Sequence, residues 1–271
     1  MYKLLCVVFL FVLMTACRND KPGAKSPASA QQKNNDSLPQ IVAGLKEDAQ
    51  KYPDSAALQL QLAAAYDSLR LYDYAITAIN NAIKNDSLNN KLWFNKGVYQ
   101  QNNGDTAGAL LSYNRSYNIY ADRQTLLYLG NLYALKGDKI TLPITKSLRD
   151  GVYDAAGSAE VDLITGTYFA RTNNVKQAMF YLDKAIGADF KLMDAYIEKG
   201  TLLFKNKKYT EAIQVYDVAI EVNPRYADSY YFKAQCMEAT GNNAAAIELY
   251  ETALQFDENF TEAKAALARL K

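Results

Sequence analysis

Residues 193–226, MDAYIEKGTLLFKNKKYTEAIQVYDVAIEVNPRY, contain the pattern that decides the fold. In the first half, apolar and small residues recur at spacings of four and three, at Tyr196, Gly200 and Leu203. Such spacings place side chains on one face of a helix. A second apolar stripe begins at Tyr209 and ends before Pro224, because proline disfavours a helical conformation in the residue before it. The segment is therefore predicted to be a helical hairpin.

The same pattern returns along the chain with a period of about 34 residues. A small residue recurs in the first helix of each unit at Ala63, Gly97, Gly130, Gly166, Gly200 and Ala234. The second helices carry a parallel series at Ala75, Ala109, Leu142, Ala178, Ala212 and Ala246. Small residues let two helices approach closely, and the tyrosines and the tryptophan fill the wider gaps between them. We therefore expect a row of stacked hairpins.

This pattern resembles the tetratricopeptide repeat, a helix-turn-helix unit of 34 residues. The resemblance implies an all-α protein, a right-handed α-solenoid of about six hairpins with capping helices. The repeat domain is expected to cover residues 56–260, with units at 56–89, 90–122, 123–158, 159–192, 193–226 and 227–260. An amino-terminal capping helix is expected within residues 38–55. A carboxy-terminal one is expected at 261–271, where a polar outer face would cover the end of the solenoid.

Unit 123–158 is degenerate. Its second helix is expected to begin late, near residues 141–143, because proline is tolerated only in the first turn of a helix. Gly151 is expected to end it. Arg149 stands where a small residue is usual, and Asp162 in the next unit stands where an aromatic residue is usual. The irregularity is either harmless or marks a bend between the first three and last three units, or a partner contact.

The amino terminus carries a different pattern. An uncharged apolar run of eleven residues, 4–14, follows Lys3. It is too short to cross a hydrocarbon core of about 30 Å but has the length of a secretory signal. The residues that follow, Thr15-Ala16-Cys17, resemble the lipobox of bacterial lipoproteins, although leucine is usual at Met14. The resemblance implies a signal peptide at 1–16 and lipidation of Cys17 by palmitate and other acyl chains; an uncleaved anchor or plain secretion is the alternative.

Residues 17–37 contain no large apolar side chain that could offset the entropy of ordering, so they are expected to form a flexible tether. A lipid-anchored chain of this kind belongs in the bacterial cell envelope. Arg18 follows the cysteine in place of the aspartate that favours inner-membrane retention in known lipoprotein sorting. The outer membrane is therefore expected, with its periplasmic face favoured over the cell surface.

Composition excludes several functions. The chain has no histidine, so it has no imidazole general base, no Ser-His or Cys-His pair and no histidine metal ligand. We therefore expect no enzyme, no metal and no cofactor. The formal net charge is +1, which favours no association with nucleic acid. After loss of the signal and acylation of Cys17, only Cys236 remains, so no intramolecular disulfide can form.

Partners of tetratricopeptide proteins usually bind in the concave groove that the first helices line. The resemblance implies the groove residues Leu60, Phe94, Leu127, Asn131, Leu163, Ile197, Phe204, Tyr231 and Gln235. The alternative is that these side chains serve packing between helices. The expected partner is another envelope protein or peptide, with the membrane engaged only through the lipid at Cys17. Family members that clamp an acidic carboxyl terminus use lysine and arginine at these positions, and none is present here.

The sequence therefore predicts a non-catalytic envelope lipoprotein whose groove binds and scaffolds another protein or peptide. Two alternatives remain. One is a glycan- or cell-wall-binding lipoprotein, whose groove aromatics would stack on sugars. The other is an assembly factor for an outer-membrane complex, of the kind represented by pilotins or by barrel-assembly components.

Overall fold

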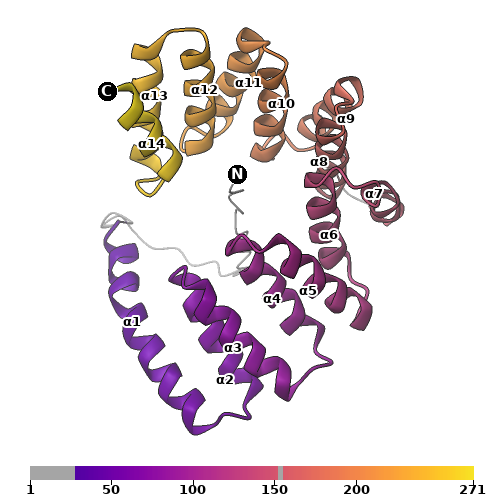
Figure 1. Cartoon of the computed structure of the whole chain (residues 1–271), viewed down its shortest axis with the longest axis vertical. Coiled ribbons are helices and arrows are strands. Elements are labelled where there is room, and N and C mark those ends of the chain that lie inside the picture. Colours follow the sequence, from indigo (N-terminus) through magenta and orange to yellow (C-terminus); the bar gives the residue numbers. More distant parts are fainter. Residues whose placement is uncertain (1–27, 152–154) are drawn as a thin grey trace, which may run out of the picture. The chain divides into compact units, whose positions relative to one another are not determined.

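The computed structural model describes residues 28–151 and 155–271, and this part of the chain is entirely helical (Figure 1). The predicted signal peptide 1–16, the lipidation residue Cys17 and the first part of the predicted tether lie outside the described residues. No strand occurs in the part of the chain that the structure describes, which confirms the all-α prediction.

Each predicted repeat contains two helices. The first helices are α2 (Ala56–Ser68), α4 (Asn90–Asn102), α6 (Arg123–Leu135), α8 (Ala155–Arg171), α10 (Met193–Lys205) and α12 (Ala227–Ala239). The second helices are α3 (Tyr72–Asn85), α5 (Thr106–Ile119), α7 (Thr141–Asp150), α9 (Val175–Ala188), α11 (Tyr209–Val222) and α13 (Asn243–Phe256). The repeats are flanked by α1 (Ala28–Lys51) and α14 (Thr261–Leu270).

Helix α1 begins ten residues before the predicted capping helix, at Ala28 rather than at 38. Residues 28–37 of the predicted tether are thus helical in the structure. Alanine, glutamine and lysine in this stretch are good helix formers, and a helix already nucleated by packing extends into them at small cost. The absence of apolar residues in this stretch gave no sign of the helix. Farther along, α1 packs against the apolar core through Val42, Leu45 and Ala49.

The degenerate unit has the predicted second helix, because α7 covers Thr141–Asp150 and Gly151 follows it as the C-cap. Pro143 is the third residue of α7, where a backbone N–H would have no partner within the helix. The preceding turn is held by Asp138, whose carboxylate accepts a hydrogen bond from the Ile140 N–H at 3.0 Å. The backbone carbonyl of Asp138 also accepts from the Thr141 hydroxyl at 2.7 Å.

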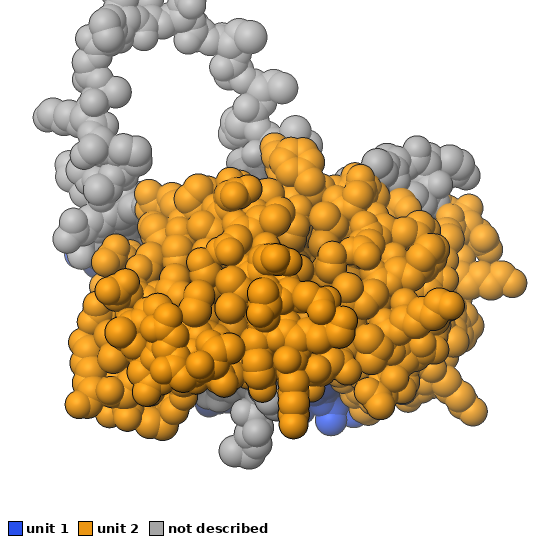
Figure 2. Space-filling view, turned by 90° about the horizontal axis from the view of Figure 1, so that it is seen from above, with its two compact units in different colours: residues 1–125 blue, residues 126–271 orange. Residues whose placement is uncertain are grey.

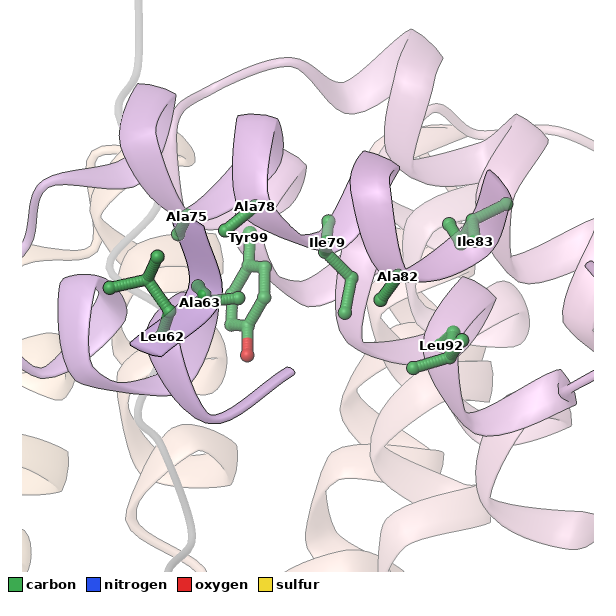
Figure 3. Close-up of a cluster of buried hydrophobic side chains, with 10 residues drawn as sticks. Leu62, Ala63, Ala75, Ala78, Ile79, Ala82, Ile83, Leu92 and Tyr99 are labelled. Atoms are coloured by element: carbon green, nitrogen blue, oxygen red, sulfur yellow. The ribbon is translucent and has the colours of Figure 1, made fainter. Parts of the chain in front are cut away.

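The chain divides into two compact units, residues 1–125 and 126–271, which Figure 2 colours separately. In the first unit, small and branched side chains of α2 and α3 form the core together with Leu92 and Tyr99 of α4 (Figure 3). Ala63 and Ala75 are completely buried there. These are members of the repeating small-residue series, so the series marks the contact between helices, as predicted.

The turn between the two helices of each repeat uses one backbone conformation. A residue with positive φ occurs at Arg70, Gly104, Gly137, Asn173, Lys207 and Gly241. These positions are separated by 34, 33, 36, 34 and 34 residues, the steps of the helix pattern itself. Only glycine adopts positive φ without steric cost, so Arg70 and Lys207 carry some backbone strain. The turn geometry is therefore imposed by packing of the two helices and does not depend on glycine.

In the second unit, the first helices α8, α10 and α12 form a row. Helix α10 packs against its own partner α11 and also contacts α8 before it and α12 after it. Helix α14 packs on α13 at the end of the chain. First helices that touch one another across repeats are typical of the inner side of a solenoid, where the predicted groove residues are expected.

Candidate functional site

We call the exposed side of the first helices the inner face, and the predicted groove residues on it the ridge: Leu60, Phe94, Leu127, Asn131, Leu163, Ile197, Phe204, Tyr231 and Gln235. Every one of these side chains is half-buried. None is enclosed in the core and none is fully exposed. The ridge therefore contributes to packing with one side of each residue and offers the other side to solvent.

In the first unit the ridge consists of Leu60 and Phe94. Leu60 packs against the buried core of α2 and α3. The ring of Phe94 lies 5.5 Å from the ring of Tyr113, a fully buried residue of α5, at an angle of 47°. Both residues are thus anchored to the core behind them.

In the second unit the ridge residues lie on α6, α8, α10 and α12. Leu163 packs against the cluster around Leu182, and Ile197 against the cluster around Tyr216. The ring of Phe204 lies 5.3 Å from that of Tyr209 in an edge-to-face arrangement. Leu127 and Asn131 of α6 are half-buried. The predicted ridge residues from different repeats thus lie at equivalent places, one or two per first helix.

Tyr231 is held in place by two aromatic rings and a hydrogen bond. Its ring lies 4.7 Å from that of Phe260 and 5.6 Å from that of Tyr250. The Gln235 amide donates a hydrogen bond of 2.9 Å to the Tyr231 hydroxyl. These contacts fix the orientation of the ring before any partner arrives, which lowers the entropy lost on binding.

Two carboxylates farther along the inner helices are neutralised by ion pairs: Glu198, the sixth residue of α10, and Glu238, the last but one of α12. Arg171 donates two hydrogen bonds, of 2.9 and 2.8 Å, to the carboxylate of Glu198. Arg269 makes a similar paired contact with Glu238, and the pKa of Glu238 is lowered chiefly by this hydrogen bond. The charges of Glu198 and Glu238 are therefore locally balanced.

The amino-terminal ends of the same helices are different. Asp194, Asp228 and Glu262 are the second residues of α10, α12 and α14 and follow one another at 34-residue steps. Among the described residues, no ion pair joins any of the three to a cation. The Tyr226 hydroxyl donates a hydrogen bond of 3.0 Å to Asp194. Sequence reasoning missed these carboxylates, although their spacing was visible.

Asp228 shows what this arrangement does to a carboxyl group. Its pKa is raised to about 6, first by burial and then by the negative charge of Asp194. Asp257 and Glu262 raise it further, and the hydrogen bond from Tyr226 lowers it. The carboxylates therefore repel one another across neighbouring repeats.

The irregular residues Asp162 and Arg149 belong to an ion-pair cluster that is separate from the ridge. Asp162 of α8 has a side chain exposed by only 1%, and its carboxylate lies 2.6 Å from Arg149 of α7 and 3.1 Å from Lys184 of α9. Both cations also lie 5.7 Å from the centre of the Tyr181 ring. The two departures from the repeat pattern compensate each other, and they join three consecutive helices.

The described residues contain no candidate metal site. No group of three or more His, Cys, Asp or Glu residues there could hold a metal ion. Cys236 is completely buried, and burial raises the pKa of its thiol to about 12, so the reactive thiolate is scarce at neutral pH. In the same part of the chain, no helix is both long and apolar enough to cross a bilayer.

Comparison with protein families agrees with the fold. Two family models, both described as tetratricopeptide repeat, match this chain: one at residues 203–270 and the other at residues 60–125 and 165–224. Together they cover more than half of the chain and leave out residues 126–164, which include the degenerate second helix α7. No curated protein matches the sequence.

Solved structures show the same architecture. A tetratricopeptide repeat protein from Parabacteroides merdae superposes with a TM-score of 0.74 at 16% identity, covering 90% of this chain and 96% of that one. Yeast Tom70 gives a TM-score of 0.57 at 16% identity, over 90% of this chain and 60% of that one. At such identities the likeness concerns the fold alone.

Proposed function

Because the chain belongs to the tetratricopeptide repeat proteins, we propose that it binds a segment of another protein on its inner face and acts as a non-catalytic scaffold. The observation that carries this proposal is the half-buried ridge, which repeats along consecutive first helices. Side chains held from behind and exposed in front are suited to bind an extended or helical peptide. The aromatic members Phe204 and Tyr231 are its anchors, since aromatic residues dominate interface energetics.

We expect truncation of these anchors to abolish partner capture. In the variant Phe204→Ala with Tyr231→Ala, recovery of partner from crosslinked cells should fall at least about tenfold, as hot-spot aromatics of a small interface contribute more than 1 kcal/mol each. The matched control is Phe180→Ala with Phe190→Ala, which removes two aromatic side chains exposed by 55% and 59% elsewhere in the same unit. Equal recovery with both double variants would remove the ridge from the proposal.

The proposal places this scaffold in the bacterial cell envelope, tethered through Cys17 to the outer membrane. Its support is the sequence pattern of a basic residue, a short apolar run and a lipobox-like cysteine. The partner is then another envelope protein. A role as assembly factor for an outer-membrane complex would be one case of this function, whereas recovery of cell-wall glycan in place of protein would favour the glycan-binding alternative.

Replacement of Cys17 tests the anchor. The variant Cys17→Ala should move the protein from the membrane fraction to the soluble fraction. Each buried methylene of an acyl chain contributes about 0.8 kcal/mol to membrane affinity, so loss of all chains removes most of it. Mass spectrometry of the natural protein should find an acylated amino-terminal peptide that begins at Cys17. An unacylated chain that begins at Met1 would contradict the anchor but leave the scaffold proposal intact.

A further inference from the structure

We propose that the inner face of α10, α12 and α14 selects a peptide segment that carries lysine or arginine next to an apolar residue. In this arrangement the cationic group binds among Asp194, Asp228 and Glu262, and the apolar residue packs on the ridge beside Tyr231. The inference rests on the proposed function and adds to it the chemistry of the partner.

The first step is the placement of the three carboxylates. They occupy one equivalent position on α10, α12 and the capping helix α14, and Glu160 lies one 34-residue step earlier on α8. Asp194 is exposed, whereas Asp228 and Glu262 are half-buried. The Tyr226 hydroxyl, which donates a hydrogen bond of 3.0 Å to Asp194, belongs to the residue two positions before Asp228. The ring of Phe260, two positions before Glu262, lies 4.7 Å from that of Tyr231 on α12. The carboxylates therefore line neighbouring helix starts, and the charges of Asp194 and Glu262 both act on Asp228.

The second step is their position beside an apolar anchor. The charges of Glu262 and Asp228 act on the Tyr231 hydroxyl and help to raise its pKa, after the larger effect of burial. Tyr231 belongs to the ridge and contacts Phe260, whose side chain is buried directly before α14. A ligand on this face therefore meets an aromatic surface and a row of negative charges side by side.

The third step is the contrast with the carboxylates farther along the same helices. Glu198 and Glu238 are paired with arginines of this chain, whereas the three carboxylates are joined by no ion pair to a cation among the described residues. Negative charge on the inner face is thus neutralised at Glu198 and Glu238 and is not neutralised by an ion pair at the amino-terminal ends of α10, α12 and α14. A ligand with a positive group complements these negative ends, and an acidic ligand is repelled by them.

Acidic residues near a helix amino terminus are often placed there only to stabilise the helix dipole. That effect would lower a carboxyl pKa, because it favours the charged form. The pKa of Asp228 is instead raised to about 6, so burial and like-charge repulsion outweigh the dipole. The fold tolerates this repulsion across repeats. A bound cation would reduce the repulsion between these carboxylates, and this gain would contribute to binding.

The cation is a side chain of a peptide rather than a metal ion. Among the described residues, no acidic group has the geometry of a metal site. The carboxylates are spread over three helices, which suits the long and flexible side chains of lysine and arginine. The adjoining apolar ridge would contribute nothing to binding of a bare ion.

Selection from a displayed library of random twelve-residue peptides tests the inference on the full chain. Peptides enriched by the natural protein should contain an excess of lysine and arginine over the unselected library. The same selection on Asp194→Asn with Asp228→Asn should lose this excess. The control is Glu211→Gln, which removes a first-turn carboxylate from the second helix α11, where it pairs with Lys208. The control should retain the excess.

An enriched basic peptide should then bind the Asp194→Asn, Asp228→Asn variant at least tenfold more weakly in fluorescence anisotropy, with natural affinity falling as salt rises. Binding to the natural protein should also weaken as the pH falls through about 6, because Asp228 becomes protonated while Asp194, Asp257, Glu262 and Tyr226 surround it. The Asn variant should lose this pH dependence.

The outcomes separate the two proposals. Enriched peptides without a basic excess, whose binding still depends on Phe204 and Tyr231, would overturn the charge inference and leave the scaffold function standing. A basic excess that survives in the Asp194→Asn, Asp228→Asn variant would also overturn it. Failure to enrich any peptide over a blank surface would count against both.

Discussion

Removal of both cations around Asp162 is expected to destabilise the second unit by about 3–5 kcal/mol at neutral pH, because it leaves a buried carboxylate without a counter-charge. The variant is Arg149→Met with Lys184→Met, which keeps an unbranched apolar side chain at each position and removes the charge. Asp162 is exposed by only 1%, whereas Arg149 and Lys184 are exposed by 40% and 47%. The carboxylate therefore cannot reach water when its partners are lost, although each cation could.

Hydrogen exchange is the appropriate measurement, since repeat proteins unfold locally and a single free energy of unfolding is not always defined. Protection should fall in α7, α8 and α9 and change little in α13, which serves as an internal reference. The triple variant with Asp162→Leu should recover protection, because an apolar residue needs no counter-charge. Unchanged protection of α8 in the double variant would mean that the ion pairs contribute nothing.

The ion-pair cluster around Asp162 illustrates what the sequence could and could not predict. Arg149 and Asp162 were each recognisable as departures from the repeat pattern. Their pairing depends on the angle between α7 and α8, which no spacing along the chain encodes. Lys184 lies on α9, the helix that follows α8. A lysine there has the appearance of an ordinary surface residue, so the sequence gives no reason to connect it with Asp162. The sequence therefore identified the irregular residues but did not predict the ion pair between them.

The helical hairpins were predictable because their signal is repeated. Each small residue of the first-helix series is buried against a neighbour, and the turns recur with the same period. Even the late start of α7 followed from one rule about proline. The amino-terminal boundary was less accessible, since residues 28–37 lack the apolar period on which the other helices were identified.

The candidate binding surface was predictable only in part. The register of the repeat predicts that the ridge residues lie on the inner face, and all of them are half-buried in the structure. The carboxylates Asp194, Asp228 and Glu262 share one register as well, but the family resemblance implies lysine and arginine on that face and gives no reason to expect an acidic row. Whether a charge is paired is decided by neighbouring helices and is visible only in the structure.

Close approach of two helices at Gly200 supports the last prediction, that Gly200→Ala destabilises the protein by about 2 kcal/mol through overpacking. A Cβ atom at Gly200 would lie 2.4 Å from the Cε1 and Cζ atoms of Tyr216, whose ring is 1% exposed and cannot move aside. Alanine is otherwise the better helix former by about 1 kcal/mol, so the sign of the effect separates packing from propensity. Gly187 of α9 is the matched control, because nothing lies within 4 Å of a Cβ built there. Gly187→Ala should raise the urea midpoint, and Gly200→Ala should lower it.

A double-mutant cycle assigns the loss to the Tyr216 ring. In the background Tyr216→Leu, which removes the ring atoms that a Cβ would meet, Gly200→Ala should cost less by about 1–2 kcal/mol, the size of coupling expected for residues in contact. The comparison matters for the other repeats too, since Gly97 stands in the same relation to Tyr113 three repeats earlier, with a hypothetical Cβ at 2.5 Å from the ring. The packing explanation would be wrong if Gly187→Ala and Gly200→Ala changed stability by the same amount and Gly200→Ala showed no coupling to Tyr216. The small-residue series would then have a cause other than close helix packing.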